Sequence, residues 1–125
     1  MMRVVEMLPE VLQKKLEQGE PIQIIDVREP EEVAMGMIRG ARHIPLGELP
    51  YRMKEIDPDA EAVLVCKIGY RSKIACQYLM AQGYTNVKNL LGGMLAWSDE
   101  AGRKIFCQAS EKMSGLLFCK NSDLA

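Results

Sequence analysis

Short apolar runs alternate along this chain with stretches in which apolar residues recur at helical spacing. The runs predict strands at residues 3–7, 22–27, 62–65 and 86–90, and residues 36–45 read as a glycine-punctuated loop around a brief apolar element. Helical spacing covers residues 9–18, 29–35 and 46–56. It recurs at Ile74, Tyr78 and Leu79, in a segment that Gly83 ends, and residues 92–97 open a last helix. Strands that alternate with helices in this way predict an α/β fold with a parallel sheet covered on both faces.

The apolar run Ala62–Val65 ends at a cysteine, Cys66, and a short loop with one glycine separates it from the next helical segment. This order places Cys66 at the carboxyl end of a buried strand and just before a helix N-terminus. Ligands of open α/β sheets bind in the crevice outside the carboxyl ends of the strands. The pattern therefore marks Cys66 as the candidate centre of a functional site.

The loop after Cys66 suits a reactive thiol. Gly69 can adopt positive φ, so that successive N–H groups turn toward one point and form a nest for an anion. The positive end of the following helix adds to this field, and Lys67 and Arg71 contribute two cations. Such surroundings favour the thiolate, which is the nucleophilic form of cysteine. The alternative interpretation is a small buried hydrophobic residue at a strand end.

Composition narrows the function classes. The chain has 125 residues, 48% of them hydrophobic and 26% charged, which is typical of one soluble globular domain. Sixteen Lys and Arg against seventeen Asp and Glu argue against nucleic acid or an anionic membrane as the main partner. No apolar run has the length of a membrane span, and the N-terminus lacks a signal-peptide core. We therefore expect the protein in the reducing cytoplasm.

The chain has four cysteines and one histidine, and their spacing does not favour a metal site. No C-x-x-C pair occurs, and His43 lies far from the cysteines, Cys66, Cys76, Cys107 and Cys119, in the sequence. Cys76 falls inside a helical pattern and is interpreted as core filling, with a role in resolving an oxidised Cys66 as the alternative. We expect neither a metal nor a cofactor.

Several motifs, taken together, resemble the single-domain rhodaneses. They are Ile24-Ile25-Asp26-Val27-Arg28-Glu29, Gly36-x-Ile38-x-Gly40-Ala41-x-x-Ile44-Pro45, Cys66-x-x-Gly69-x-Arg71-Ser72, Gly83-Tyr84-x-x-Val87 and Leu91-Gly92-Gly93-x-x-x-Trp97. The resemblance covers about residues 3–100, and Met37 departs from it at a position that is often histidine. It implies a three-layer α/β/α fold with a central, mostly parallel, five-stranded sheet, and a rhodanese-like domain at residues 1–102. Residues 103–125 are then a C-terminal extension of unknown role.

The resemblance also implies a sulfurtransferase. Cys66 would take the outer sulfur of thiosulfate or of a persulfide and pass it to cyanide, to a thiol or to a sulfur-accepting protein. The substrate would be held by the loop that follows the cysteine, namely Lys67, Ile68, Gly69, Tyr70, Arg71 and Ser72. In this interpretation the backbone N–H groups hold the transferring charge, Arg71 orients an anionic donor and Lys67 steers it.

Other conspicuous residues are interpreted as structural. Asp26 and Arg28 are expected to form a polar pair at a strand end, Trp97 to pack the last helix on the sheet, and His43 to sit in a loop or at the edge of the core. Tyr70 is ambiguous, because its ring fits either a pocket wall or solvent.

Two rival functions stay open. One is a cysteine-dependent phosphatase of related architecture, and the other is an interaction module or sulfur carrier with the same fold. The loop length argues against the phosphatase, because only four residues separate Cys66 from Arg71 and the phosphatase loop is one residue longer. The intact Cys66, Gly69 and Arg71 argue against an inactive module.

Overall fold

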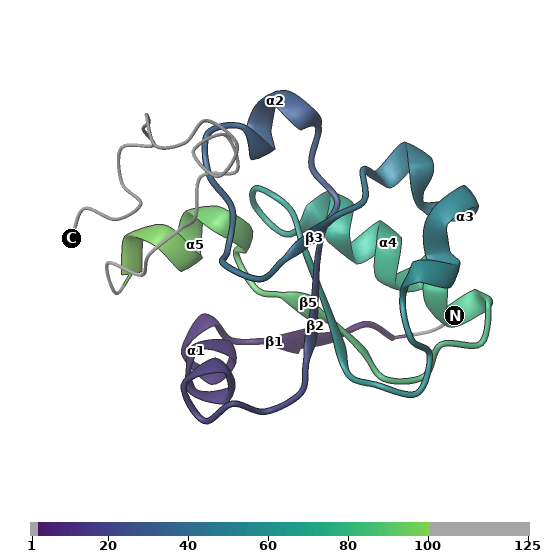
Figure 1. Ribbon diagram of the computed structural model, residues 1–125, viewed down its shortest axis with the longest axis horizontal. Coiled ribbons are helices and arrows are strands. Elements are labelled where there is room, and N and C mark those ends of the chain that lie inside the picture. The colour runs from purple at the N-terminus through teal and green to yellow at the C-terminus, as the bar shows by residue number, and fades with distance from the viewer. Residues whose placement is uncertain (1–2, 101–125) are drawn as a thin grey trace.

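A five-stranded sheet forms the centre of the molecule in the computed structural model, which describes residues 3–100 (Figure 1). The strands are β1 (Val5–Met7), β2 (Gln23–Asp26), β3 (Arg42–His43), β4 (Ala62–Val65) and β5 (Val87–Leu90). Their order across the sheet is β1-β5-β4-β2-β3, and every neighbouring pair is parallel. The predicted parallel sheet is therefore confirmed.

The connections between the strands are helical. They contain α1 (Pro9–Glu17), α2 (Pro30–Val33), α3 (Leu49–Arg52) and α4 (Tyr70–Ala81), with two short 3₁₀ turns, η1 (Leu46–Glu48) and η2 (Met53–Glu55), on either side of α3. The helix α5 (Gly93–Glu100) follows β5. The helical spacing at residues 46–56 is thus realised as three short pieces. Pro50 lies in the first turn of α3, where its missing N–H costs no helical hydrogen bond.

Two apolar cores lie on opposite faces of the sheet, as expected from the alternation of side chains along a strand. On one face, Ile25 and Leu64 pack with Leu79 of α4 and Leu49 of α3. On the other face, the neighbouring strand positions pack against α1 and α5, and this cluster contains Leu12, Ile24, Val63, Val65, Leu90, Met94 and Trp97. Figure 1 shows α1 and α5 on one side of the strands and α3 and α4 on the other. The three-layer α/β/α prediction is confirmed.

The two residues of β3 complete the sheet at its edge. They pair with Ile25 and Asp26 of β2, and the N–H of Ile44 donates to the carbonyl of Asp26 at 2.9 Å. The sequence pattern predicted only a brief apolar element here, because a two-residue strand is too short for a periodic signal.

Some sequence interpretations fall on the end of the chain. Residues 101–125, with Cys107 and Cys119, lie outside the described residues, so the division at residue 102 stays a prediction. Within residues 3–100, no helix has both the length and the apolar character that a membrane span needs.

Candidate active site

The topology of the sheet creates a crevice beside Cys66. The chain runs from β2 outward to the edge strand β3 and then returns to β4 on the other side of β2. The carboxyl ends of β2 and β4 therefore form a topological switch point, which is where open α/β sheets bind ligands. Cys66 follows β4 directly, and α4 begins four residues later at Tyr70.

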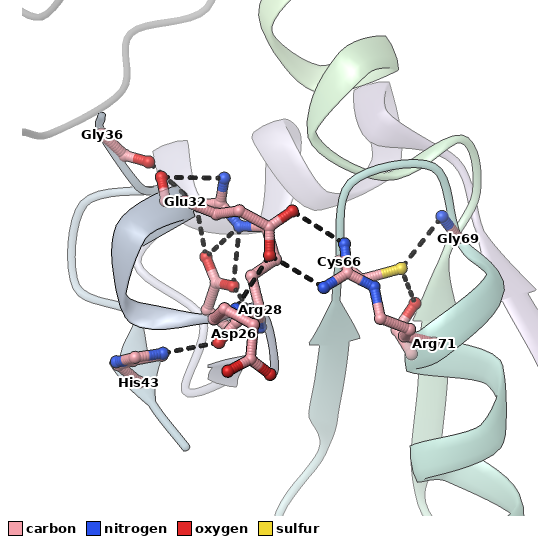
Figure 2. A network of polar contacts seen from close by, with 10 residues as sticks. Asp26, Arg28, Glu32, Gly36, His43, Cys66, Gly69 and Arg71 are labelled. Carbon is pink, nitrogen blue, oxygen red and sulfur yellow. Dashed lines mark hydrogen bonds and ion pairs between the residues drawn. The ribbon is translucent and has the colours of Figure 1, made fainter. Parts of the chain in front are cut away.

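The Cys66 sulfur lies inside the loop and receives polar contacts from it. Cys66 has no exposed surface, and the N–H of Gly69 donates to Sγ at 3.1 Å (Figure 2). The Ser72 hydroxyl lies 3.2 Å from Sγ. Gly69 has φ +103°, a conformation that side-chain-bearing residues rarely adopt, and this conformation turns its N–H back toward the sulfur. The predicted anion nest thus has at least one N–H directed at the cysteine.

The start of α5 is hydrogen-bonded to the cysteine loop. Met94 and Leu95 donate their N–H groups to the carbonyls of Cys66 and Lys67, at 2.8 and 3.1 Å. Gly93 has φ +61°, and a Cβ added there would lie 2.5 Å from both of these carbonyl oxygens. The second glycine of the Gly92-Gly93 pair is therefore needed for close approach, which the sequence alone did not reveal.

Arg71 lies beside the loop, and its guanidinium is already paired. Its two terminal nitrogens donate to the two carboxylate oxygens of Glu32 at 2.8 and 2.9 Å, as Figure 2 shows. These hydrogen bonds lower the pKa of the Glu32 carboxyl from 4.5 to about 2. The sequence analysis gave Arg71 to an anionic donor alone. In the structure, a donor would have to share the guanidinium with Glu32 or displace it.

Glu32 was missed in the sequence, although a signal for its position exists. The Glu32 side chain accepts the N–H of Glu29 at 2.8 Å, and together they form a capping box at the start of α2. The spacing of these two glutamates after the apolar run of β2 predicts a helix start. It does not predict a partner 39 residues away in the sequence.

The predicted Asp26–Arg28 pair is confirmed as a buried structural contact. The Arg28 guanidinium donates to both carboxylate oxygens of Asp26 and also to the carbonyl of Gly36 at 2.8 Å. His43 is half-buried in the edge strand, and its Nε2 lies 2.7 Å from the carbonyl of Arg28. Removing one partner of such a buried pair costs about 3–5 kcal/mol. The network ties α2, and with it Glu32, to the end of β2.

The remaining loop residues point outward. Lys67, Ile68 and Tyr70 are exposed, so the ring of Tyr70 lies largely in solvent, whereas Ser72 is fully buried. Lys67 also lines a pocket of about 300 Å³. The other lining residues come from the segment after β2, from α2 and the turn that follows it, and from α5, namely Arg28, Glu32, Met35, Gly36, Met94 and Leu95. This pocket is the concave surface next to the loop.

A buried asparagine on β5, Asn89, also joins the site. Its amide nitrogen donates to the carbonyl of Gly69 at 3.0 Å, and its amide oxygen accepts a short hydrogen bond from Ser72. The sequence analysis assigned it no role, because an asparagine within an apolar strand carries no motif.

Metal-binding clusters can be sought only among residues 3–100. Within them, no cluster of three His, Cys, Asp or Glu residues could hold a metal.

With this geometry in place, comparison with known proteins decides the family. The profile of the rhodanese-like domain matches residues 8–100. The chain belongs to that family. The match includes the cysteine loop, the Glu32 helix and the Gly92-Gly93 pair.

Individual relatives of this rhodanese-like chain are similar over most of their own length. A sulfurtransferase of Allochromatium vinosum is 45% identical over 89 residues, which are 71% of this chain and 83% of the relative. The thiosulfate sulfurtransferase GlpE of Pseudomonas aeruginosa is 36% identical over 89 residues, covering 71% and 79%. A crystal structure of a rhodanese-like domain protein from Staphylococcus aureus matches with a TM-score of 0.73 and 37% identity, covering 78% of this chain and 95% of that one.

Proposed function

We propose that this protein is a sulfurtransferase that carries sulfane sulfur as a persulfide on Cys66. The proposal rests on the position of the Cys66 sulfur. The sulfur lies within a loop, and the N–H of Gly69 donates to it at 3.1 Å. A thiolate is nucleophilic, and N–H donors directed at one point favour charge at that point. The sulfurtransferase relatives give the same reaction class.

The proposed reaction has two steps. In the first, the Cys66 thiolate attacks the outer sulfur of thiosulfate, the S–S bond of the donor breaks, and sulfite leaves with the bonding electron pair. In the second, a nucleophile attacks the outer sulfur of the persulfide, and the thiolate is released. Cyanide would give thiocyanate, and a thiol would give a new persulfide. Two half-reactions on one enzyme predict ping-pong kinetics.

The loop is proposed to bind the donor. Because Cys66 has no exposed surface, the loop must yield before a donor reaches the sulfur, and this favours small donors such as thiosulfate or a low-molecular-weight persulfide. Lys67, at the adjoining pocket, would attract an anionic donor as a point charge. The backbone of Ile68, Gly69 and Tyr70 would hold the transferred sulfur. The Arg71 cation would act there together with Glu32.

The proposed compartment and the proposed sulfur acceptor follow from the same chemistry. The proposed reaction begins with Cys66 reduced, so we propose the reducing cytoplasm as the compartment. The acceptor is a thiol, on a small molecule or on a sulfur-accepting protein, and cyanide is its laboratory substitute.

The pairing of Arg71 weakens the phosphatase alternative. A phosphatase of this architecture needs a loop that surrounds a tetrahedral phosphoryl group, and a guanidinium free to bind it. Here four residues separate Cys66 from Arg71, and both terminal nitrogens of the guanidinium are hydrogen-bonded to Glu32. We therefore expect no Cys66-dependent hydrolysis of aryl phosphates.

Peptide mass spectrometry after incubation with thiosulfate tests the proposal. The tryptic peptide 55–67 contains Cys66 and no other cysteine, whereas Cys76 lies on the peptide 74–88. We expect one added sulfur atom on peptide 55–67, its loss on addition of cyanide with formation of thiocyanate, and no adduct in Cys66→Ser. Sulfur on another cysteine, or Cys66-dependent phosphatase activity without an adduct, would contradict the proposal. An adduct that cyanide and thiols fail to remove would indicate a dedicated carrier for one protein partner.

A further inference from the structure

The side-chain amide of Asn89 has only one orientation that its surroundings accept. The residue lies on β5 and is 2% exposed. Its Nδ2 lies 3.0 Å from the carbonyl oxygen of Gly69 and 3.1 Å from Oε1 of Glu6 on β1. A carbonyl and a carboxylate only accept hydrogen bonds, so both require the NH₂ group at this position. Turning the amide over would set its oxygen against both acceptors.

This orientation determines where the Ser72 proton goes. The fixed amide directs Oδ1 at the Ser72 hydroxyl, and the two atoms form a short hydrogen bond. A hydroxyl has one proton, and an amide oxygen has none to give, so Ser72 is the donor. The Ser72 oxygen therefore presents a lone pair to the Cys66 sulfur, 3.2 Å away. That lone pair is satisfied by a thiol S–H and not by a thiolate.

We propose that Asn89 is a positioning residue that acts through Ser72 to hold the resting Cys66 as the thiol. If Cys66 loses its proton, Ser72 must turn its hydroxyl toward the sulfur, and Oδ1 of Asn89 then stays buried without a donor. The Gly69 N–H donates to the sulfur in either state and favours the thiolate. Asn89 and Gly69 thus act on the nucleophile in opposite directions. The inference rests on the proposed function only in taking Cys66 as the nucleophile.

Two substitutions of Asn89 give opposite expectations. Asn89→Leu keeps the size of the side chain but removes the acceptor, so the Ser72 proton becomes free to donate to a thiolate. The pH profile of Cys66 alkylation should move to lower pH by about one unit, a tenfold change in thiolate fraction. Asn89→Asp keeps an acceptor for Ser72 but sets a second oxygen against the Gly69 carbonyl and the Glu6 carboxylate. Its negative charge alone should move the profile to higher pH. The readout that separates a proton role from a structural role is therefore the downward shift in Asn89→Leu and its dependence on Ser72.

Alkylation by iodoacetamide, followed on peptide 55–67, is the measurement. It requires no sulfur transfer, so its result stands apart from the outcome of the thiosulfate experiment. Asn89→Leu adds no charge. The charged and titratable groups on the elements around Cys66 are Lys67, Arg71 with Glu32, the Asp26–Arg28 pair, the Cys76 thiol and Glu6. Of these, only Glu6 loses a hydrogen bond in the variant.

A double variant and a matched control complete the test. If Asn89 acts through Ser72, the profiles of Ser72→Ala and Ser72→Ala/Asn89→Leu should coincide. Asn86→Leu makes the same change just before β5, where the side chain contacts Lys88 and not the loop, and it should leave the profile unchanged. An unmoved or raised profile in Asn89→Leu, or a shift that persists without Ser72, would overturn the proposal. If Asn89→Leu does not fold, Ser72→Ala decides: a profile moved to lower pH agrees with a Ser72 lone pair held toward the thiol, and a profile moved to higher pH would overturn the proposal.

Discussion

Cys66 and Cys76 are equally buried, yet their surroundings give the two thiols different chemistry. Both have no exposed surface, and both belong to the apolar cluster on the α4 side of the sheet. Cys66 also has the Gly69 N–H and the Ser72 hydroxyl at its sulfur. For Cys76, burial is the largest influence and raises the pKa of the thiol to about 12. Exposure alone therefore does not distinguish the two thiols.

The difference comes from the backbone around each cysteine. Cys76 lies in the middle of α4, where the N–H groups of the helix donate to carbonyls one turn back. Cys66 comes before the same helix, where the first N–H groups have no carbonyl partner within the helix. A loop with a positive-φ glycine can direct such groups at a sulfur atom. The position relative to the helix, rather than the depth in the core, distinguishes the two sites.

The largest expected difference is between two single variants, in which one or the other of these cysteines is replaced by alanine. Cys66→Ala should lower thiosulfate:cyanide sulfur transfer by about a thousandfold or more, because it removes the nucleophile. Cys76→Ala should keep the activity and lose about 1 kcal/mol of unfolding free energy through a small cavity. Steady-state rates and urea unfolding measure the two effects.

The same pair can be compared by alkylation at neutral pH. Cys66 should be modified in the native protein and Cys76 only after denaturation. Modification of native Cys76 at a comparable rate, or loss of sulfur transfer in the alanine variant of Cys76, would contradict the comparison.

The next effect concerns the contact that holds the Cys66 loop. Gly93→Ala places a methyl group 2.5 Å from the carbonyl oxygens of Cys66 and Lys67, which is too close, so the loop and the start of α5 must separate. We expect a loss of about 2–4 kcal/mol in unfolding free energy and a fall in Cys66-dependent activity. Gly19→Ala is the matched control, since φ is +70° there and a Cβ meets nothing within 4 Å. It should cost only the left-handed strain, about 1–2 kcal/mol, and leave activity intact. Equal losses in both variants would show that the close approach at Gly93 is unimportant.

The smallest effect concerns the ion pair beside the loop. The folded-state pKa of Glu32 is about 2, below its ordinary 4.5, so the pair stabilises the protein above pH 4.5 and this contribution disappears as the pH falls toward 2. Glu32→Gln should therefore lower the unfolding free energy by about 1 kcal/mol at pH 7, since both side chains are partly solvated. The difference from wild type should shrink between pH 4.5 and 2.

Urea unfolding across this pH range measures the effect of Glu32. Glu31→Gln, the exposed neighbour on α2, serves as the control and should show little change at any pH. A Glu32→Gln deficit that is independent of pH would mean that packing, and not charge, is lost. Release of Arg71 should also alter the thiosulfate KM in this variant, because the guanidinium then becomes free for an anionic donor.

Much of this site follows from local features of the sequence. The apolar run before Cys66 predicts a buried strand, Gly69 and the following helical spacing predict a tight loop and a helix N-terminus, and these positions agree with the structure. The buried pair of Asp26 and Arg28 was also predictable, because both residues lie at one strand end. Trp97 was predicted to pack the last helix on the sheet, and it belongs to the buried cluster on the α1 and α5 face. Each of these inferences uses residues close together in the chain.

Other parts of the site were decided by the tertiary structure. Glu32, Asn89 and Gly93 come from three segments separate from the cysteine loop, and the strand order β5-β4-β2 brings them around Cys66. Propensity and periodicity describe only neighbours along the chain, so they do not reveal that Arg71 pairs with a carboxylate 39 residues earlier. The choice of Cys66 as the proposed nucleophile is thus local, whereas the partners of its loop and of Arg71 depend on which strands the fold places side by side.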